Sequence, residues 1–186
     1  ADYDACVSAG ICVPRANTAG DPNPIFPATY VSWREAATYC DWVGKRLPTE
    51  AEWEKAARGP DGLIWPWGNR LKDDVFEPVQ RANVADSEYG HLLEGPQFER
   101  GASPYGAINM IGNVWEWTAD WYQADYYATR PNPDQSPSGP SRDVSNGHKA
   151  VRGGSFRSLG AEAHSTSRHS LDPDSHLDDV GFRCAF

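Results

Sequence analysis

The chain has 186 residues, which is long enough for one domain with a buried core. Hydrophobic residues make up 39% of it and charged residues 23%, values that exclude a disordered chain and favour a globular one. The formal net charge of −9 argues against a nucleic-acid partner, because binding to phosphates needs a basic surface. No apolar run reaches the roughly 20 residues of a membrane helix, so we expect no transmembrane segment and at most peripheral membrane association.

Two capping boxes mark helix starts in the first third of the chain. Ser32 is followed three residues later by Glu35, and Thr49 by Glu52, so that side chain and backbone can satisfy each other's hydrogen bonds. A glycine follows each segment where its helical pattern stops. A further short helix fits the opening of the chain. The sequence therefore predicts three helices, over residues 2–8, 33–43 and 50–59.

After these helices the chain is expected to form short strands joined by long connections. Strands are predicted at Val114–Thr118, Ala150–Arg152 and Val180–Cys184, where β-branched and aromatic residues gather. Trp65–Asn69 is predicted to be a turn, and Thr129–Lys149, which is rich in Pro, Ser, Asn and Gly, a surface loop. These elements indicate an α+β fold with much coil, and a single domain over residues 1–186.

Four cysteines stand at positions 6, 12, 40 and 184 and allow three pairings. They form no CxxC motif and lack the spacing of a tetrahedral zinc site. Two disulfides are the preferred interpretation, which places the domain in an oxidising compartment outside the cytoplasm. Four buried free thiols are the alternative.

A series of short motifs follows in order from residue 31 to the end of the chain: VSW at 31–33, GKRLPTEAEWE at 44–54, PWGN at 66–69, ANV at 82–84, GNVWEW at 112–117, RGGSF at 152–156 and GFRCA at 181–185. Together they resemble the formylglycine-generating enzyme, or sulfatase-modifying factor, family. The resemblance implies a C-type-lectin-like α+β fold with little regular secondary structure. Family domains begin with several more strands, so the chain is expected to lack the family's N-terminal strands.

The resemblance also identifies the positions at which the enzymes of the family hold copper. Those enzymes use two cysteine thiolates, soft ligands that suit Cu(I), shortly after a Gly-Gly-Ser turn. The matching positions here are Ser158 and Ala163, and neither can supply a thiolate. We therefore expect a pseudoenzyme that binds no copper. The family pattern further implies a Cys40–Cys184 disulfide, and Cys6 and Cys12 would then pair with each other.

A second enzymatic branch of this fold uses non-haem iron held by histidines, so a metal-dependent oxidoreductase or accessory enzyme is the alternative function. His164 and His169 are five residues apart, which matches neither a helical pair nor one face of a strand. All five histidines fall in predicted loops and are expected to lie at the surface: His91, His148, His164, His169 and His176.

Calcium is the metal that the resemblance favours, as a structural ion held by hard oxygen ligands. Asn109 and Glu116 would supply side-chain oxygens, while Gly112 and Val114 would supply backbone carbonyls. The alternative is that Asn109 and Glu116 only hydrogen-bond the loop between them.

The second calcium site of the family is half matched. Asn83 and Val84 occupy the positions of its first two ligands, but the acidic loop that follows is shortened and rewritten here. Asp86 or Glu88 could stand in for the remaining ligands.

The leading functional hypothesis is a non-catalytic binding or structural module, a subunit or domain of an extracytoplasmic assembly with a protein partner. The candidate contact surfaces are Thr129–Lys149, which Tyr126 and Tyr127 precede as interface anchors, and Leu159–Leu177. A lectin-like carbohydrate-binding domain is a further alternative, although no Glu-Pro-Asn or Trp-Asn-Asp triplet occurs.

Overall fold

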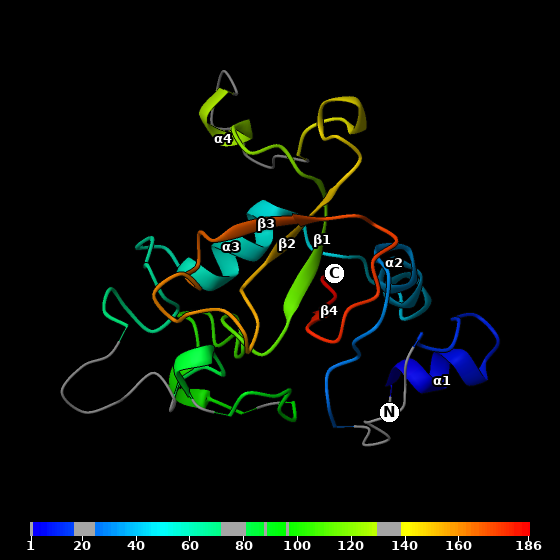
Figure 1. Cartoon of the computed structure of the whole chain (residues 1–186), viewed down its shortest axis with the longest axis horizontal. Helices are drawn as coiled ribbons and strands as arrows, with labels where there is room; N and C mark the ends of the chain where they lie inside the picture. The colour runs from blue at the N-terminus through cyan, green and yellow to red at the C-terminus, as the bar shows by residue number, and fades with distance from the viewer. Residues whose placement is uncertain (1, 17–24, 72–80, 88, 96, 130–138) are drawn as a thin grey trace.

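The computed structural model describes residues 2–16, 25–71, 81–87, 89–95, 97–129 and 139–186 (Figure 1). Helices and strands make up only part of this, and long irregular segments connect them. The helices are α1 (Asp2–Ser8), α2 (Trp33–Trp42), α3 (Glu50–Arg58) and the single-turn α4 (Tyr126–Thr129). The strands are β1 (Trp115–Trp121), β2 (Lys149–Arg152), β3 (Arg168–Leu171) and β4 (Val180–Phe182).

The four strands form one mixed sheet in the order β3-β2-β1-β4. β2 runs antiparallel to both β1 and β3, whereas β4 runs parallel to β1. α3 packs against β1 and β2, α2 packs against β1, and α1 packs against α2 (Figure 1). This arrangement confirms the α+β, coil-rich fold expected from the sequence.

Both predicted capping boxes are formed. The Glu35 amide donates to Ser32 Oγ at 3.3 Å, and the Ser32 amide donates to Glu35 Oε2 at 2.7 Å. Thr49 and Glu52 make the same reciprocal pair at the start of α3. The two helices end one residue earlier than predicted, because the residues expected to close them act as C-caps instead.

The strand predictions were right about position but wrong in extent, and one strand was missed. β1 extends three residues beyond its predicted end, and β4 stops two residues short of its own. β3 falls inside the Leu159–Leu177 segment, for which the sequence predicts no strand. None of its residues is buried on either face, and three of the four are polar, so the segment shows no apolar alternation.

The predicted Thr129–Lys149 loop contains more regular structure than expected. Thr129 is the last residue of α4, residues 142–144 form a single 3₁₀ turn, and Lys149 begins β2. Residues 130–138 of this segment lie outside the described part of the chain. The Trp65–Asn69 turn was correctly predicted, and reciprocal backbone hydrogen bonds between Trp65 and Gly68 close it at 2.9 and 3.0 Å.

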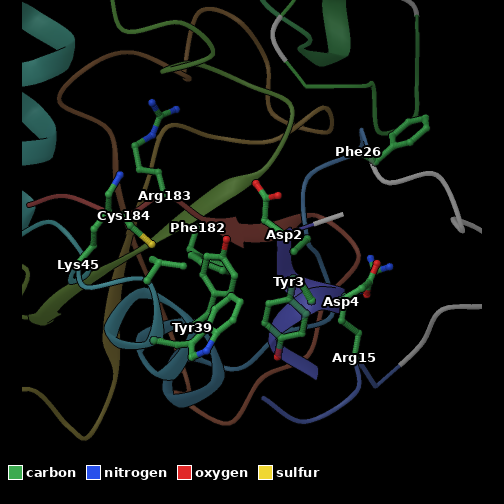
Figure 2. A pocket seen from close by; sticks show the side chains of 14 residues that line it. Asp2, Tyr3, Asp4, Arg15, Phe26, Tyr39, Lys45, Phe182, Arg183 and Cys184 are labelled. Carbon is green, nitrogen blue, oxygen red and sulfur yellow. The ribbon is translucent and has the colours of Figure 1, made fainter. Parts of the chain in front are cut away.

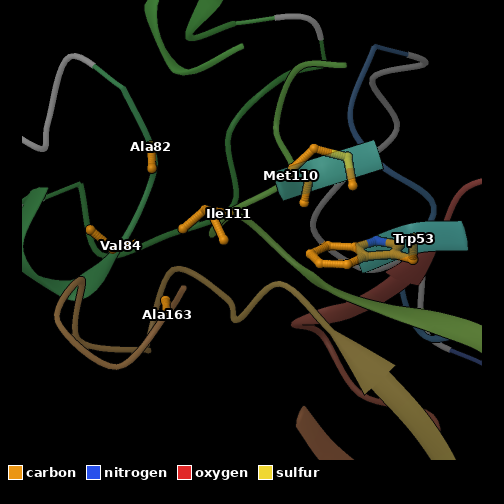
Figure 3. Packing of buried hydrophobic residues seen from close by; sticks show 7 residues of the cluster. Trp53, Ala82, Val84, Met110, Ile111 and Ala163 are labelled. Atoms are coloured by element: carbon orange, nitrogen blue, oxygen red, sulfur yellow. The ribbon is translucent and has the colours of Figure 1, made fainter. Parts of the chain in front are cut away.

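Tryptophans anchor two of the apolar clusters. Trp117, fully buried on β1, packs with Val151 and Val180 of the neighbouring strands and with Cys40 of α2. Trp53 of α3 packs with Met110 in a second cluster, whose other members are Ala57, Ala82, Val84, Ile111 and Ala163 (Figure 3). A third, smaller cluster joins α1 to the segment before α2.

A buried ion network fixes α3 to the sheet. Glu50, only 1% exposed, accepts from Arg152 of β2 at 2.9 Å and from Arg168 of β3 through both of its carboxylate oxygens. Arg152 also donates to Glu54, one turn further along α3, at 2.7 Å. Loss of either arginine would remove one of the two cations that compensate the buried Glu50 carboxylate, which is a destabilising change.

Two disulfides are present, with the pairing that the resemblance implied. Cys6 and Cys12 close a short loop at the end of α1. Cys40 of α2 is joined to Cys184, which follows β4. No cysteine is free.

Candidate functional site

The two positions that match the copper cysteines meet beside Gly154. A Cβ built on Gly154 would lie 2.8 Å from Ala163 Cβ and 3.2 Å from Ser158 Cβ. Ser158 Oγ accepts a hydrogen bond from the Ser155 amide at 3.0 Å, and Ala163 is buried in the Trp53 cluster (Figure 3). The structure thus brings the two positions together, but a hydroxyl and a methyl group occupy them.

The Gly153–Ser155 turn next to this position is held by protein contacts. The Gly153 carbonyl accepts from the Gly112 amide at 2.9 Å, and Ser155 Oγ donates to Asp179 at 2.9 Å. Asp179 and Asp178 both approach Arg157, whose guanidinium donates to Asp178 at 2.8 and 2.9 Å. This cluster is an ion-paired turn that supports β4.

The loop from Asn109 to Glu116 carries the first predicted calcium site. Asn109 has a left-handed backbone (φ 53°), and its buried Oδ1 has no hydrogen-bond partner in the described structure. Glu116 accepts from Trp53 Nε1 at 2.6 Å and from Arg183 Nε and Nη2 at 2.6 and 2.7 Å. Both proposed side chains therefore point into the protein, and one of their oxygens lacks a partner.

The backbone ligands predicted for this site lie in the same loop. The Gly112 carbonyl accepts from the Val114 amide at 2.9 Å, and among the described residues no hydrogen bond reaches the Val114 carbonyl. A buried amide oxygen without a donor, together with carbonyls and a carboxylate, is a donor set that suits a hard cation. The residues present fit calcium.

The residues of the second predicted calcium site accept hydrogen bonds from other groups of the protein. Asn83 Oδ1 and the Val84 carbonyl both accept from Ser87 Oγ, at 3.3 and 2.6 Å. Asp86 accepts from the Gly160 amide at 2.7 Å, and Glu88 lies outside the described residues. The second site stays a prediction.

The histidines make separate contacts. His164 lies edge-on to Trp65, with the ring centroids 6.4 Å apart, and His176 contacts Glu35 at 2.9 Å. His169 was expected in a loop, but it lies on β3 and packs against Trp115. Within the described part of the chain, no three His, Cys, Asp or Glu side chains cluster in a way that could hold a metal ion.

A lysine and an aspartate are buried where β1 meets β2. Lys149 Nζ lies between the rings of Trp33 and Trp121, 3.8 and 3.9 Å from their centroids, and donates to the Ala119 carbonyl at 2.7 Å. Burial lowers the pKa of Lys149 to about 8. Asp120 accepts from the Glu50 amide at 2.7 Å, and burial raises its pKa to about 6. The contacts of Lys149 hold the last residue of the predicted Thr129–Lys149 loop against the sheet.

A groove of about 570 Å³ lies between α1, α2 and β4 (Figure 2). Tyr39 forms its floor, with ring centroids 5.7 Å from Tyr3 and 5.4 Å from Phe182. Charged side chains of both signs surround these rings: Asp2, Asp4, Arg15, Lys45 and Arg183. The groove was not predicted, because its walls come from opposite ends of the sequence.

The last residue of β4, Phe182, lines this groove. β1 and β4 are in register with Trp115 opposite Val180, and the Trp115 amide donates to the Asp179 carbonyl at 2.8 Å. In this parallel register the amide and carbonyl of Gly181 face β1. The amides and carbonyls of Val180 and Phe182 therefore point away from the sheet, and no backbone partner for them occurs among the described residues. Val180 is only 1% exposed, so a partner cannot reach its backbone, and Phe182 is the β4 residue that lines the groove.

Fold and site together define a disulfide-bonded, coil-rich α+β domain. The chain belongs to the sulfatase-modifying factor enzyme 1-like domain family, whose sequence model matches residues 1–186. No helix in the described part of the chain has the length and apolar character needed to cross a membrane.

Relatives in this family include proteins named as formylglycine-generating enzymes and one named as inactive. The formylglycine-generating enzyme of Bos taurus is 37% identical over 175 residues, covering 87% of this chain and 44% of that protein. The inactive C-alpha-formylglycine-generating enzyme 2 of Bos taurus is 38% identical over 175 residues, covering 86% of this chain and 50% of its own length. The chain thus spans about half the length of the curated relatives it matches.

A solved structure shows the same fold. PvdO from Pseudomonas aeruginosa superposes with a TM-score of 0.76 over 96% of this chain and 73% of its own, at 21% sequence identity. At this identity the likeness establishes the fold alone.

Proposed function

We propose that this chain is a non-catalytic binding or structural module of its family, acting as a subunit or domain of an extracytoplasmic assembly. The observation that carries the proposal is the pair Ser158 and Ala163, which meet beside Gly154 without a thiol between them. All four cysteines are in disulfides, so the chain holds no thiolate for Cu(I) or for thiol exchange with a substrate. A family relative that is itself named inactive supports the same reading.

Restoring the thiols tests this interpretation directly. The wild-type protein should leave a cysteine peptide of the sulfatase type unchanged when assayed by mass spectrometry with added copper. The double variant Ser158→Cys/Ala163→Cys should bind one Cu(I) per chain under mild reduction, and the single variant Ser158→Cys should bind it far more weakly. Conversion of the peptide by the wild-type protein would refute the non-catalytic proposal. Failure of the double variant to bind Cu(I) would refute the assignment of the two positions.

The disulfides support the location. Structural disulfides persist in oxidising compartments, and this chain has two of them. An extracytoplasmic protein should carry both bonds quantitatively when isolated from its native source without reductant. Mass spectrometry of the alkylated protein measures this, and free thiols at all four cysteines would contradict the proposed location.

We also propose a structural calcium ion at the Asn109–Glu116 loop. The unpartnered Oδ1 of Asn109 supports it, because a buried polar atom without a partner is costly unless a ligand satisfies it. Calcium should raise the melting temperature of the wild-type protein relative to EDTA. Asn109→Ala should abolish the rise, whereas Asn146→Ala should keep it, since Asn146 has the same φ of 53° but is exposed. An equal calcium response in both variants would remove Asn109 from the site.

The groove beside β4 is the surface we propose for the protein partner. A partner segment there would contact the aromatic rings of Tyr3, Tyr39 and Phe182 and the charged side chains around them. This adds a third candidate surface to the Thr129–Lys149 and Leu159–Leu177 segments.

Partners that co-purify with the tagged protein from its native source test this surface. Phe26→Asp places a charge on the groove wall and should lose a stoichiometric partner, whereas Tyr105→Asp, at a 56% exposed residue outside the groove, should keep it. Retention by both variants would exclude the groove as the contact. A wild-type protein that purifies alone would count against a subunit role.

A further inference from the structure

Arg183 links the two ends of the Asn109–Glu116 loop. Its Nε donates to Glu116 Oε2 at 2.6 Å, and its Nη2 donates to Glu116 Oε1 at 2.7 Å. The same Nη2 also donates to the carbonyls of Ile108 and Asn109 at 3.2 and 3.1 Å. One guanidinium therefore holds the carboxylate at one end of the loop and the backbone at the other.

The charge of Glu116 makes this contact necessary. The Glu116 side chain is 8% exposed, and a buried carboxylate is strongly unfavourable unless a cation and hydrogen bonds compensate it. Trp53 supplies one hydrogen bond to Glu116 but no charge. Arg183 supplies the charge in a two-bonded arrangement, which is the strong form of an arginine–carboxylate pair.

The contacts of Arg183 also set the conformation of Asn109. By binding the Ile108 and Asn109 carbonyls, Arg183 fixes the peptide groups on both sides of the Asn109 Cα atom. Asn109 then keeps its left-handed backbone and holds its side chain in the buried position where Oδ1 has no partner. The loop is thus shaped for a cation ligand by a side chain that is not itself a ligand.

We propose that Arg183 is an internal cation that closes this loop without a bound metal, so that a calcium ion there would share Glu116 with it. Arg183 is a positioning residue for the loop. The part of the inference that concerns calcium rests on the calcium site proposed above, whereas the pairing of Arg183 with Glu116 does not. The fold of the wild-type protein should consequently persist in EDTA, with calcium adding only modestly to its stability.

Thermal unfolding of four proteins, each in EDTA and in excess calcium, tests the inference. In EDTA, Arg183→Met should lower the melting temperature by about 10 °C, because it strands a buried carboxylate. The double variant Glu116→Gln/Arg183→Met should recover part of this loss, since it removes the stranded charge. Arg183→Lys keeps the positive charge but loses the two-bonded guanidinium geometry, so its melting temperature should lie between those of the wild type and Arg183→Met. Calcium should raise the melting temperature of Arg183→Met more than that of the wild type.

The outcomes separate the inference from the calcium proposal. If Arg183→Met and the double variant lose the same stability in EDTA, Glu116 is not the group that Arg183 neutralises, and the inference is wrong. If the double variant recovers stability but calcium changes none of the four melting temperatures, the role of Arg183 as an internal cation is supported and the proposed calcium site is refuted. If calcium raises the melting temperature of the wild type as much as that of Arg183→Met, the calcium site is supported and the role of Arg183 as an internal cation is refuted.

Discussion

Removal of the Cys40–Cys184 disulfide should reduce stability far more than removal of Cys6–Cys12. The first bond joins residues 144 positions apart, and the second joins residues 6 positions apart. A cross-link stabilises mainly by restricting the unfolded chain, so its effect grows with the logarithm of the loop it closes. This relation gives about 5 kcal/mol for the long loop and about 2 kcal/mol for the short one.

Paired Cys→Ala variants at each disulfide, unfolded with urea, measure this difference. Alanine suits these positions because Cys6 and Cys40 are fully buried and Cys12 nearly so. For a chain of this size, the long-loop variant should melt about 10–20 °C below the wild type and the short-loop variant about 4–8 °C below it. The urea m value should rise in the long-loop variant, because its unfolded chain exposes more surface.

Equal losses in the two variants would refute the argument from loop length. Such a result would mean that local packing around each sulfur pair, rather than the restricted unfolded chain, sets the contribution of the bond. A larger loss from Cys6–Cys12 would show that α1 holds more of the fold than its contacts with α2 indicate.

Two further predictions concern single residues. Asp120→Asn should flatten the pH dependence of stability between about pH 4 and 6. Because burial raises the pKa of Asp120 to about 6, this carboxyl binds a proton more tightly in the folded state than in the unfolded state. The free energy of unfolding of the wild type should therefore fall by about 3 kcal/mol as pH rises through this window. A difference between the unfolding free energies of wild type and variant that stays constant with pH would contradict this. Gly112→Ala should destabilise by several kcal/mol and Gly44→Ala by about 1–2 kcal/mol. Both glycines have positive φ, but only at Gly112 would the new methyl meet a backbone oxygen, that of Asn83 at 2.1 Å; equal losses in urea titrations would show that this loop can move aside.

The features that the sequence predicted best are local in sequence. The capping pairs Ser32 with Glu35 and Thr49 with Glu52 each lie within four consecutive residues, and both are formed as predicted. β3 was not predicted because none of its residues is buried, so its sequence lacks the apolar alternation by which a half-buried strand is recognised. The fold class could therefore be predicted, while the extent of the sheet could not.

Only those residues of the candidate site that lie in family motifs could be predicted from the sequence. The family resemblance located the Asn109–Glu116 loop and the positions of Ser158 and Ala163. It gave no sign of the role of Arg183, which lies 67 residues from Glu116 and whose function depends on that distant contact. The terminal motif that contains Arg183 was visible in the sequence, but only the folded chain shows which carboxylate it reaches.

The long disulfide also imposes an order on the maturation of the protein. During synthesis Cys6, Cys12 and Cys40 are all made long before Cys184, so Cys40 waits as a thiol while two other cysteines are within reach. Thiol exchange would allow Cys40 to pair with either of them. Because Cys6 and Cys12 can join each other at once, their bond withdraws both competitors and leaves Cys40 available for Cys184. The Cys6–Cys12 disulfide would thereby favour the correct pairing of Cys40 with Cys184 during oxidative folding. This role is separate from its small contribution to the stability of the folded protein.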